Sequence, residues 1–211
     1  MAKLTGGIFG RLTGKLGDFV LYTRNGETIV RKRSPRKGKE PTQKQMENRQ
    51  KFKCVSKFVS AIAQLLPITF TGSHDHSCRN NVFKYHYQNA IKGVYPQFSI
   101  DYEKALLSSG TLEKADCPTV LAGGRCEIKF KWYNNSGKLA ANENDKAVLM
   151  IYCPELNKCV FEITNTKRRE GYEKIQAICF RDRTVHTWIT FLKIDDSGSS
   201  DSVYCGEVVI R

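Results

Sequence analysis

The chain has 211 residues, of which 40% are hydrophobic and 26% charged, a globular composition with enough length to bury a substantial core. No apolar run reaches the length of a membrane-spanning helix, and the start MAKLTGGIFG lacks the apolar stretch of a secretory signal. The formal net charge of +13 makes nucleic acid, an anionic membrane face or an acidic protein physically reasonable partners.

The positive charge is concentrated in the N-terminal quarter. Residues 1–57 hold fifteen Lys or Arg against four Asp or Glu, whereas residues 58–211 hold nineteen against seventeen. Any electrostatic partner should therefore meet the N-terminal segment. The changes in composition predict three parts: a basic Gly-rich arm and β-hairpin in 1–40, a helical region in 41–95 and a β-sandwich in 96–211.

The glycine-rich start, GGIFGRLTGKLG, does not meet the requirements of a phosphate-binding loop. Gly14-Lys15 is followed by Leu16 instead of Ser or Thr, and Phe9 occupies the place of the first glycine. No predicted strand precedes the glycines, so a dinucleotide-binding fingerprint fails too. We expect a flexible arm or close-packed turns here.

The stretch FVLYTRNGETIVRK predicts a two-residue β-hairpin. Asn25-Gly26 is the preferred pair for a type I′ turn and sets a register in which Arg24 faces Glu27, Phe19 faces Lys32 and Asp18 faces Arg33. Two opposite-charge pairs then close the ladder. Both faces carry apolar residues, and an isolated hairpin is marginal in water, so it must pack on its own domain, another subunit or a partner.

A basic run, Arg31 to Lys39, follows the hairpin and reads as a linker, with Pro35 and Gly38 inside it. These cations could contact a protein or a phosphate backbone, with an aromatic side chain available for stacking on bases. The predicted partner- or phosphate-binding residues are Tyr22, Arg24, Arg31, Lys32, Arg33, Arg36, Lys37 and Lys39.

A helix is predicted from Thr42, which forms a capping box with Gln45, to the residue before Pro67. It could bind an acidic surface, but the favoured interpretation is that its apolar stripe packs on the core while its lysines remain solvated. The stripe consists of Met46, Phe52, Val55, Val59, Ile62 and Leu66. A second helix is expected in residues 79–92, ended by Gly93.

From residue 98 the hydrophobic period changes to two, which indicates short strands separated by turns. Seven strands of this kind predict an antiparallel immunoglobulin- or fibronectin-like sandwich, with Trp132 as a core aromatic residue. The fold class is therefore mainly β with a helical insert (α+β). The predicted strands lie within residues 98–107, 126–133, 147–153, 158–164, 174–180, 184–194 and 202–210.

No residue set defines a reaction. His74, His76 and Cys78 in HDHSC are the right side chains for zinc, but alternate loop positions give poor geometry and a second half-site is missing. The eight cysteines include no CxxC pair. Cys153 and Cys159 could pair across a turn in an oxidising compartment, yet reduced, semi-buried thiols are the simpler interpretation. We expect no enzyme activity and no cofactor.

The segments GKLGDFVLYTRNGETIVRKR, PTQKQMENRQKF, NDKAVLMIYCPE and SDSVYCGEVVI together resemble an uncharacterised bacterial family, a domain of unknown function. The resemblance runs nearly end to end and implies that arm, helices and sandwich form one unit. It implies no activity and supplies no catalytic residues.

These observations favour a non-enzymatic structural or adaptor protein whose N-terminal arm, hairpin and helix dock on a protein partner, or on further copies, within a larger assembly such as a phage-like particle. The alternative is sequence-nonspecific DNA or RNA binding through the same cations. A metal-dependent enzyme ranks lower. The chain is expected in the cytoplasm or in a particle, and no small-molecule substrate is evident.

Overall fold

The computed structural model describes residues 3–5, 11–33, 40–70, 76–137 and 140–211. The chain divides into two compact units, Met1–Thr42 and Gln43–Arg211, each of which is described by itself. Among the described residues, no helix is both long and apolar enough to cross a membrane.

The first unit contains a four-stranded antiparallel sheet. Its strands are β1 (Lys3–Thr5), β2 (Arg11–Leu16), β3 (Phe19–Arg24) and β4 (Glu27–Lys32), in the order β1-β2-β3-β4. The β3–β4 register is the predicted one over all six pairs, from Arg24–Glu27 to Phe19–Lys32. Asn25 and Gly26 have φ of 52° and 87°, as a type I′ turn requires.

The prediction of a flexible arm or close-packed turns before this hairpin was wrong for residues 11–16. They form β2, which pairs with β3 across a tight turn at Gly17 and Asp18. Gly17 has a φ of 55°, a conformation that costs glycine little, so this glycine permits a second hairpin. Residues 6–10, with three of the glycines, lie outside the described residues.

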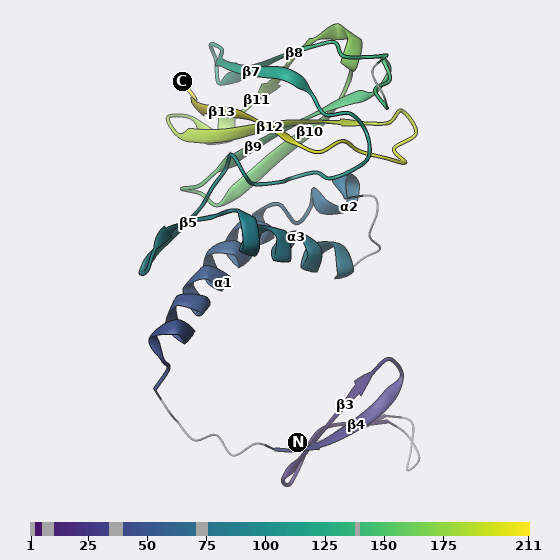
Figure 1. Ribbon diagram of the computed structural model, residues 1–211, viewed down its shortest axis with the longest axis vertical. Coiled ribbons are helices and arrows are strands. Elements are labelled where there is room, and N and C mark those ends of the chain that lie inside the picture. Colours follow the sequence, from purple (N-terminus) through teal and green to yellow (C-terminus); the bar gives the residue numbers. More distant parts are fainter. Residues whose placement is uncertain (1–2, 6–10, 34–39, 71–75, 138–139) are drawn as a thin grey trace. The chain divides into compact units, whose positions relative to one another are not determined.

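The second unit contains the predicted seven-stranded antiparallel sandwich (Figure 1). One sheet has the order β11-β8-β7 and the other β10-β9-β12-β13, and the chain crosses between the sheets after β8, β10 and β11. The seven strands are β7 (Asp116–Ala122), β8 (Glu127–Tyr133), β9 (Lys146–Cys153), β10 (Lys158–Lys167), β11 (Tyr172–Gln176), β12 (Thr184–Leu192) and β13 (Val203–Val209).

One predicted strand belongs elsewhere. Residues 97–100 form β6 (Gln97–Ile100), which pairs only with β5 (Ile91–Val94) in a separate hairpin, and β7 takes its place in the sandwich. The sequence of β7 conceals a strand because Pro118 lies inside it, Cys117 has a φ of 44° and the register shifts between Asp116 and Thr119. Proline is tolerated because β7 is an edge strand.

Three helices precede the sandwich: α1 (Gln43–Ala61), α2 (Leu66–Thr69) and α3 (His76–Asn89). α1 starts directly after Thr42, where the capping box predicts its start. Pro67 does not end this helix; it lies in the first turn of α2, a position that suits its missing N–H. Gly93 does not end α3 either, since α3 stops at Asn89 and Gly93 lies in β5.

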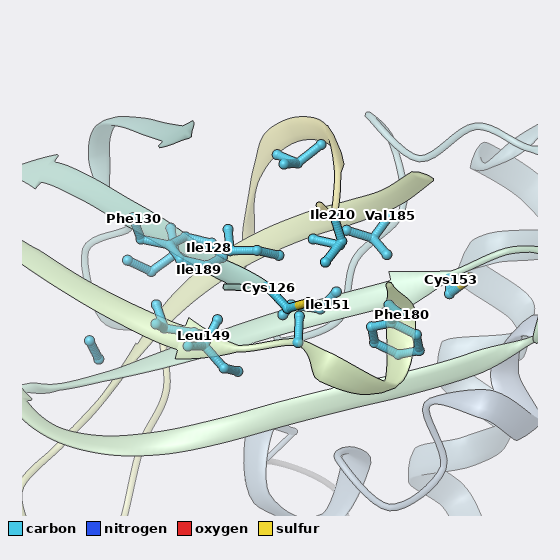
Figure 2. Packing of buried hydrophobic residues seen from close by; sticks show 14 of the residues in the cluster. Cys126, Ile128, Phe130, Leu149, Ile151, Cys153, Phe180, Val185, Ile189 and Ile210 are labelled. Carbon is cyan, nitrogen blue, oxygen red and sulfur yellow. The ribbon is translucent and has the colours of Figure 1, made fainter. Parts of the chain in front are cut away.

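Two cores share the central sheet β10-β9-β12-β13. One core lies between the two sheets (Figure 2). It includes Trp132, as predicted. The other core lies between the central sheet and the helices (Figure 1). It includes Val55, Phe58 and Val59 of α1. In β9, residues 147, 149, 151 and 153 enter the first core, and residues 148, 150 and 152 enter the second. The central sheet is therefore buried on both faces.

Candidate interaction surfaces

The N-terminal sheet has one face covered with apolar side chains, here called the apolar sheet face. The register places Leu16 opposite Phe19 and Leu21 opposite Val30, so these four side chains share a face. Leu16, Phe19 and Val30 are 56%, 48% and 57% exposed, and Leu21 is the only described hydrophobic residue of this unit that is buried. Because most of this face is in contact with water, the sheet needs a covering partner.

The opposite side, here called the basic sheet face, carries two of the four predicted cations that the structure describes. Arg24 and Arg31 lie on it with Tyr22, and all three are exposed. Lys15, which is opposite Val20, lies on the same face. Alternation along the strands thus separates an apolar surface from a cationic one.

The predicted charge pairs of the hairpin do not form ion pairs in the described part of the chain. Arg24 lies opposite Glu27, but both side chains are solvated. Arg33 donates its backbone N–H to the carbonyl of Asp18 at 2.6 Å, which extends the ladder by one residue without a side-chain contact. These arginines are therefore free to meet a partner's anions.

Of the remaining predicted binding residues, one lies on the apolar sheet face and three lie outside the described residues. Lys32 is exposed but lies on the apolar sheet face, opposite Phe19. Arg36, Lys37 and Lys39 lie outside the described residues. The structure consequently describes five of the eight predicted residues and places them on both sides of one sheet.

The first half of α1 leaves part of its predicted apolar stripe uncovered. Val55, Val59, Ile62 and Leu66 are buried as expected, but Met46 is 36% exposed and Phe52 is 57% exposed, so the prediction that the whole stripe packs on the core was wrong. The Phe52 ring lies 4.7 Å from that of Phe83, which stacks on Tyr87 at 6.0 Å. We call Phe52, Phe83 and Tyr87 the aromatic helix patch.

The weak metal candidates are not brought together as a site by the described residues. Cys78 is buried in the helical core, and its thiol donates to the carbonyl of Leu66 at 3.9 Å. His74 lies outside the described residues, and nothing is described of the His76 side chain. Over the described ranges, no group of three or more His, Cys, Asp or Glu could hold an ion.

All eight cysteines lie in the described part of the chain, and none of them forms a disulfide. The Cys153–Cys159 pairing left open by the sequence does not form, because the register sets Cys153 opposite Lys158 and Cys159 opposite Tyr152. The two thiols therefore lie on opposite faces of the β9–β10 hairpin, Cys153 in the core between the sheets and Cys159 against the helical core.

Sequence reasoning missed a fully buried arginine. The guanidinium of Arg168 lies 3.1 Å from the Asp145 carboxylate, donates to the Asn135 side chain at 2.7 Å and to the Glu113 carbonyl at 2.8 Å, and rests 3.9 Å from the Phe191 ring. Burial lowers the pKa of Arg168, and Asp145 opposes this shift. Each partner of the Arg168 guanidinium is a buried part of the fold, so this side chain serves stability and not chemistry.

Two histidines are also held in the fold. His86 is completely buried, and burial lowers its pKa. Its Nδ1 lies 2.8 Å from the Val82 carbonyl and its Nε2 accepts the Leu106 N–H at 3.2 Å, which is the pattern of a neutral ring. His186 stacks on Tyr102 at 3.7 Å. The Nδ1 of His186 also lies 2.8 Å from the Tyr204 hydroxyl, so a second aromatic residue holds this ring.

A family described as "Family of unknown function (DUF6266)" matches residues 11–206, which span the N-terminal sheet, the helices and the sandwich. No curated protein matches the sequence. A solved structure, the fn3 domain of the human collagen alpha-1(XX) chain, is 12% identical, with a TM-score of 0.33, and the match covers 49% of this chain and 93% of that domain.

Proposed function

We propose a function for this chain, which belongs to the DUF6266 family of unknown function: it is a non-enzymatic structural or adaptor protein. Its N-terminal sheet and the exposed part of α1 dock on a partner protein within a larger assembly, such as a phage-like particle. The sandwich acts as the rigid body that carries these surfaces. The proposal does not require any residue to perform a reaction.

The observation that carries this proposal is the exposed apolar sheet face. A sheet of short strands with one buried hydrophobic side chain among its described residues has too little core to be stable in isolation. Covering three half-exposed side chains the size of Leu, Phe and Val would contribute about 1 kcal/mol each, because apolar burial is worth roughly 25 cal/mol per Å². A partner that covers the apolar sheet face would therefore stabilise both molecules.

The aromatic helix patch supports docking through a second surface. Aromatic side chains with large exposed areas are enriched at protein interfaces, where they supply contact area at a small entropic cost. Phe52 is 57% exposed although it lies on the apolar stripe of α1. A partner that covers Phe52 would explain why this part of the stripe remains apolar.

The test uses full-length variants in a pulldown from nuclease-treated lysate, followed by size measurement of the purified complex by light scattering. The Phe19→Ser/Val30→Ser variant should lose the proteins, or the self-association, that the wild type retains. The Leu121→Ser/Ile178→Ser variant is the control, because Leu121 and Ile178 are 58% and 70% exposed on the second unit. Equal retention by both variants would refute the assignment of the docking surface.

Nucleic-acid binding is the second candidate, and the unpaired cations of the basic sheet face favour it. If Arg24 and Arg31 each contact a phosphate, Arg24→Gln/Arg31→Gln should reduce the slope of log K against log salt by about 1.8, since each contact contributes roughly 0.9 for duplex DNA. Lys84→Gln/Lys158→Gln, which removes two exposed lysines of the second unit, should leave the slope unchanged. Binding that is insensitive to salt would rule this function out.

A further inference from the structure

A groove in the second unit has a composition that neither core formation nor the docking surfaces require. It has a volume of about 370 Å³ and lies between α1, the β5–β6 hairpin and the β9–β10 turn. On α1 the lining residues are Gln50, Lys53, Cys54, Lys57 and Phe58, whose spacing places them on one stripe of the helix. The volume falls within the range of pockets that bind small molecules, roughly 300–1,000 Å³.

The floor of the groove is aromatic and rigid. Phe58 and Tyr152 are both buried, and their rings meet edge to face at 5.0 Å. Tyr102 lies 5.8 Å from Tyr152 and is held from the other side by its stack on His186. Since these rings pack in two directions, the floor cannot collapse into the groove, and it offers a preformed apolar surface.

The rim of the groove is cationic. Lys53 and Lys57 are exposed and form no ion pair with a described residue. Lys51 lies close by, with its ammonium group 5.1 Å from the centre of the Phe98 ring, which is itself part of the lining. The residues that line the groove include no Asp or Glu, so nothing in the lining neutralises the two lysines.

Polar groups between floor and rim are available to a ligand. No described residue forms a hydrogen bond with the Tyr102 hydroxyl, and burial, reinforced by Cys54, raises the pKa of Tyr102 to about 12. The phenol therefore keeps its proton at neutral pH and can donate a hydrogen bond to a ligand. Asn157 is already occupied, since it accepts from the Tyr152 hydroxyl at 3.0 Å and donates to the Lys57 carbonyl at 3.3 Å, which joins the β9–β10 turn to α1.

We propose that this groove binds a small organic anion that joins an aromatic body to a carboxylate or phosphate group. The aromatic body lies on the partly exposed ring of Tyr102, which the buried rings of Phe58 and Tyr152 support. The anionic group meets Lys53 and Lys57, which lie one helical turn apart on the same side of α1. The site is independent of the docking surfaces, and their failure in a test would not affect it.

The chemistry of the groove indicates binding and not turnover. Cys54 is the only nucleophile on the helical stripe, and burial raises the pKa of its thiol, with Lys57 opposing that shift. A thiol with a raised pKa is protonated and unreactive at neutral pH. No His or carboxylate lines the groove to act as a base.

The test is a titration of the full-length protein, followed by two-dimensional NMR of the backbone amides. Phenyl phosphate and phenylacetate are the probes, and benzyl alcohol is the uncharged analogue. We expect both anions to shift the amides of α1 from Gln50 to Lys57 and those of Phe98 to Ile100. Lys53→Gln/Lys57→Gln should weaken the affinity for the two anions about tenfold or more, because each lysine supplies a charge-assisted contact. The same variant should leave the affinity for benzyl alcohol unchanged.

Lys84→Gln/Lys158→Gln is the matched control, since it removes the same charge from exposed positions outside the groove. It should bind both anions within about twofold of the wild type, as expected for charges screened by salt. The proposal is overturned if neither anion shifts the groove amides at 10 mM, if the shifts occur only in the N-terminal sheet, or if both double variants lose affinity equally. A stronger response to phenyl phosphate than to phenylacetate would identify a phosphorylated ligand, and the reverse a carboxylate.

Discussion

Replacing Arg168 by Met should destabilise the second unit by about 3–5 kcal/mol, the cost of breaking a buried ion pair by removing one partner. Arg168 is fully buried and Asp145 is 2% exposed. Methionine fills most of the volume, so the main loss is electrostatic: the Asp145 carboxylate remains in the interior without its cation. The side chain of Asn135 also loses its donor, which adds to the cost.

The assay is urea unfolding followed by tryptophan fluorescence. Both tryptophans of the chain, Trp132 and Trp188, lie in the second unit, so the signal reports on that unit. Trp132 is also a direct sensor, because its indole N–H donates to the carbonyl of Arg168 at 2.8 Å. For a unit of this size each kcal/mol lowers Tm by about 2–4 °C. In a thermal melt followed by the same fluorescence, the expected decrease in Tm is therefore about 6–20 °C.

Two further variants make the reasoning refutable. Arg183→Met removes a cation whose partner, Glu155, is 59% exposed in a 2.8 Å pair at the surface, and it should cost less than about 1 kcal/mol. Arg168→Met/Asp145→Asn removes the stranded charge and should be at least about 1 kcal/mol more stable than Arg168→Met alone. If Arg168→Met costs no more than Arg183→Met, or if the second substitution recovers nothing, the buried pair does not have the importance assigned to it.

Two other changes test the packing of the second unit. Burial lowers the pKa of His86 below its ordinary value near 6.5, so on acidification the unfolded chain binds a proton at this residue before the folded chain does. The free energy of unfolding that depends on neutral His86 is therefore fully present above pH 6.5 and should fall as the pH drops from 7 to 5. In urea unfolding at both pH values His86→Gln should show a smaller decrease than the wild type, and an equal decrease would contradict the assignment. A Cβ at Gly110 would lie 1.9 Å from the Ser199 carbonyl oxygen, so Gly110→Ala should cost about 1–3 kcal/mol, whereas Gly124→Ala, with no atom within 4 Å, should cost under about 0.5 kcal/mol. Equal costs for the two alanines would show that the backbone at Gly110 can move aside.

Local patterns in the sequence predicted the elements that depend on neighbours along the chain. The Asn25-Gly26 turn determined the β3–β4 register because only the primed turns match the twist of a two-residue hairpin. Alternation in residues 126–133 predicted β8 and the burial of Trp132. Elements whose stability comes from a distant neighbour were harder to predict from the sequence. One of them is β7, which contains Pro118 and whose place in the sheet depends on pairing with β8.

The third layer of the second unit was missed although the sequence contained a signal for it. A strand in a sandwich with one solvated face should alternate, yet AVLMIYC in β9 is apolar without interruption. Seven of the eight β9 residues are buried, because the helices cover the face that a two-layer sandwich would expose. A continuous apolar run therefore indicates a strand covered on both sides.

The candidate surfaces were predicted unevenly for the same reason. Cations and exposed aromatic residues in the hairpin could be assigned to faces from the strand period alone. The groove could not, because its lining comes from segments up to about a hundred residues apart in the sequence, from Lys57 on α1 to Asn157 in the β9–β10 turn. Lysines on α1 are solvated in any helix of this composition, and only the contacts of β6 and the β9–β10 turn enclose a space beside them.

The pair Arg168 and Arg169 shows where determination by sequence ends. The sequence determined the concentration of positive charge near the N-terminus, the hairpin register and the strands with clear alternation, since these depend on composition, turn chemistry and residue period. Only the tertiary structure decided that Arg168 is buried against Asp145 while Arg169 meets Glu143 at the surface, 3.7 Å away. The two residues are chemically identical neighbours, so their difference arises from what the fold packs around each of them, and burial changes the cost of a lost charge partner several-fold.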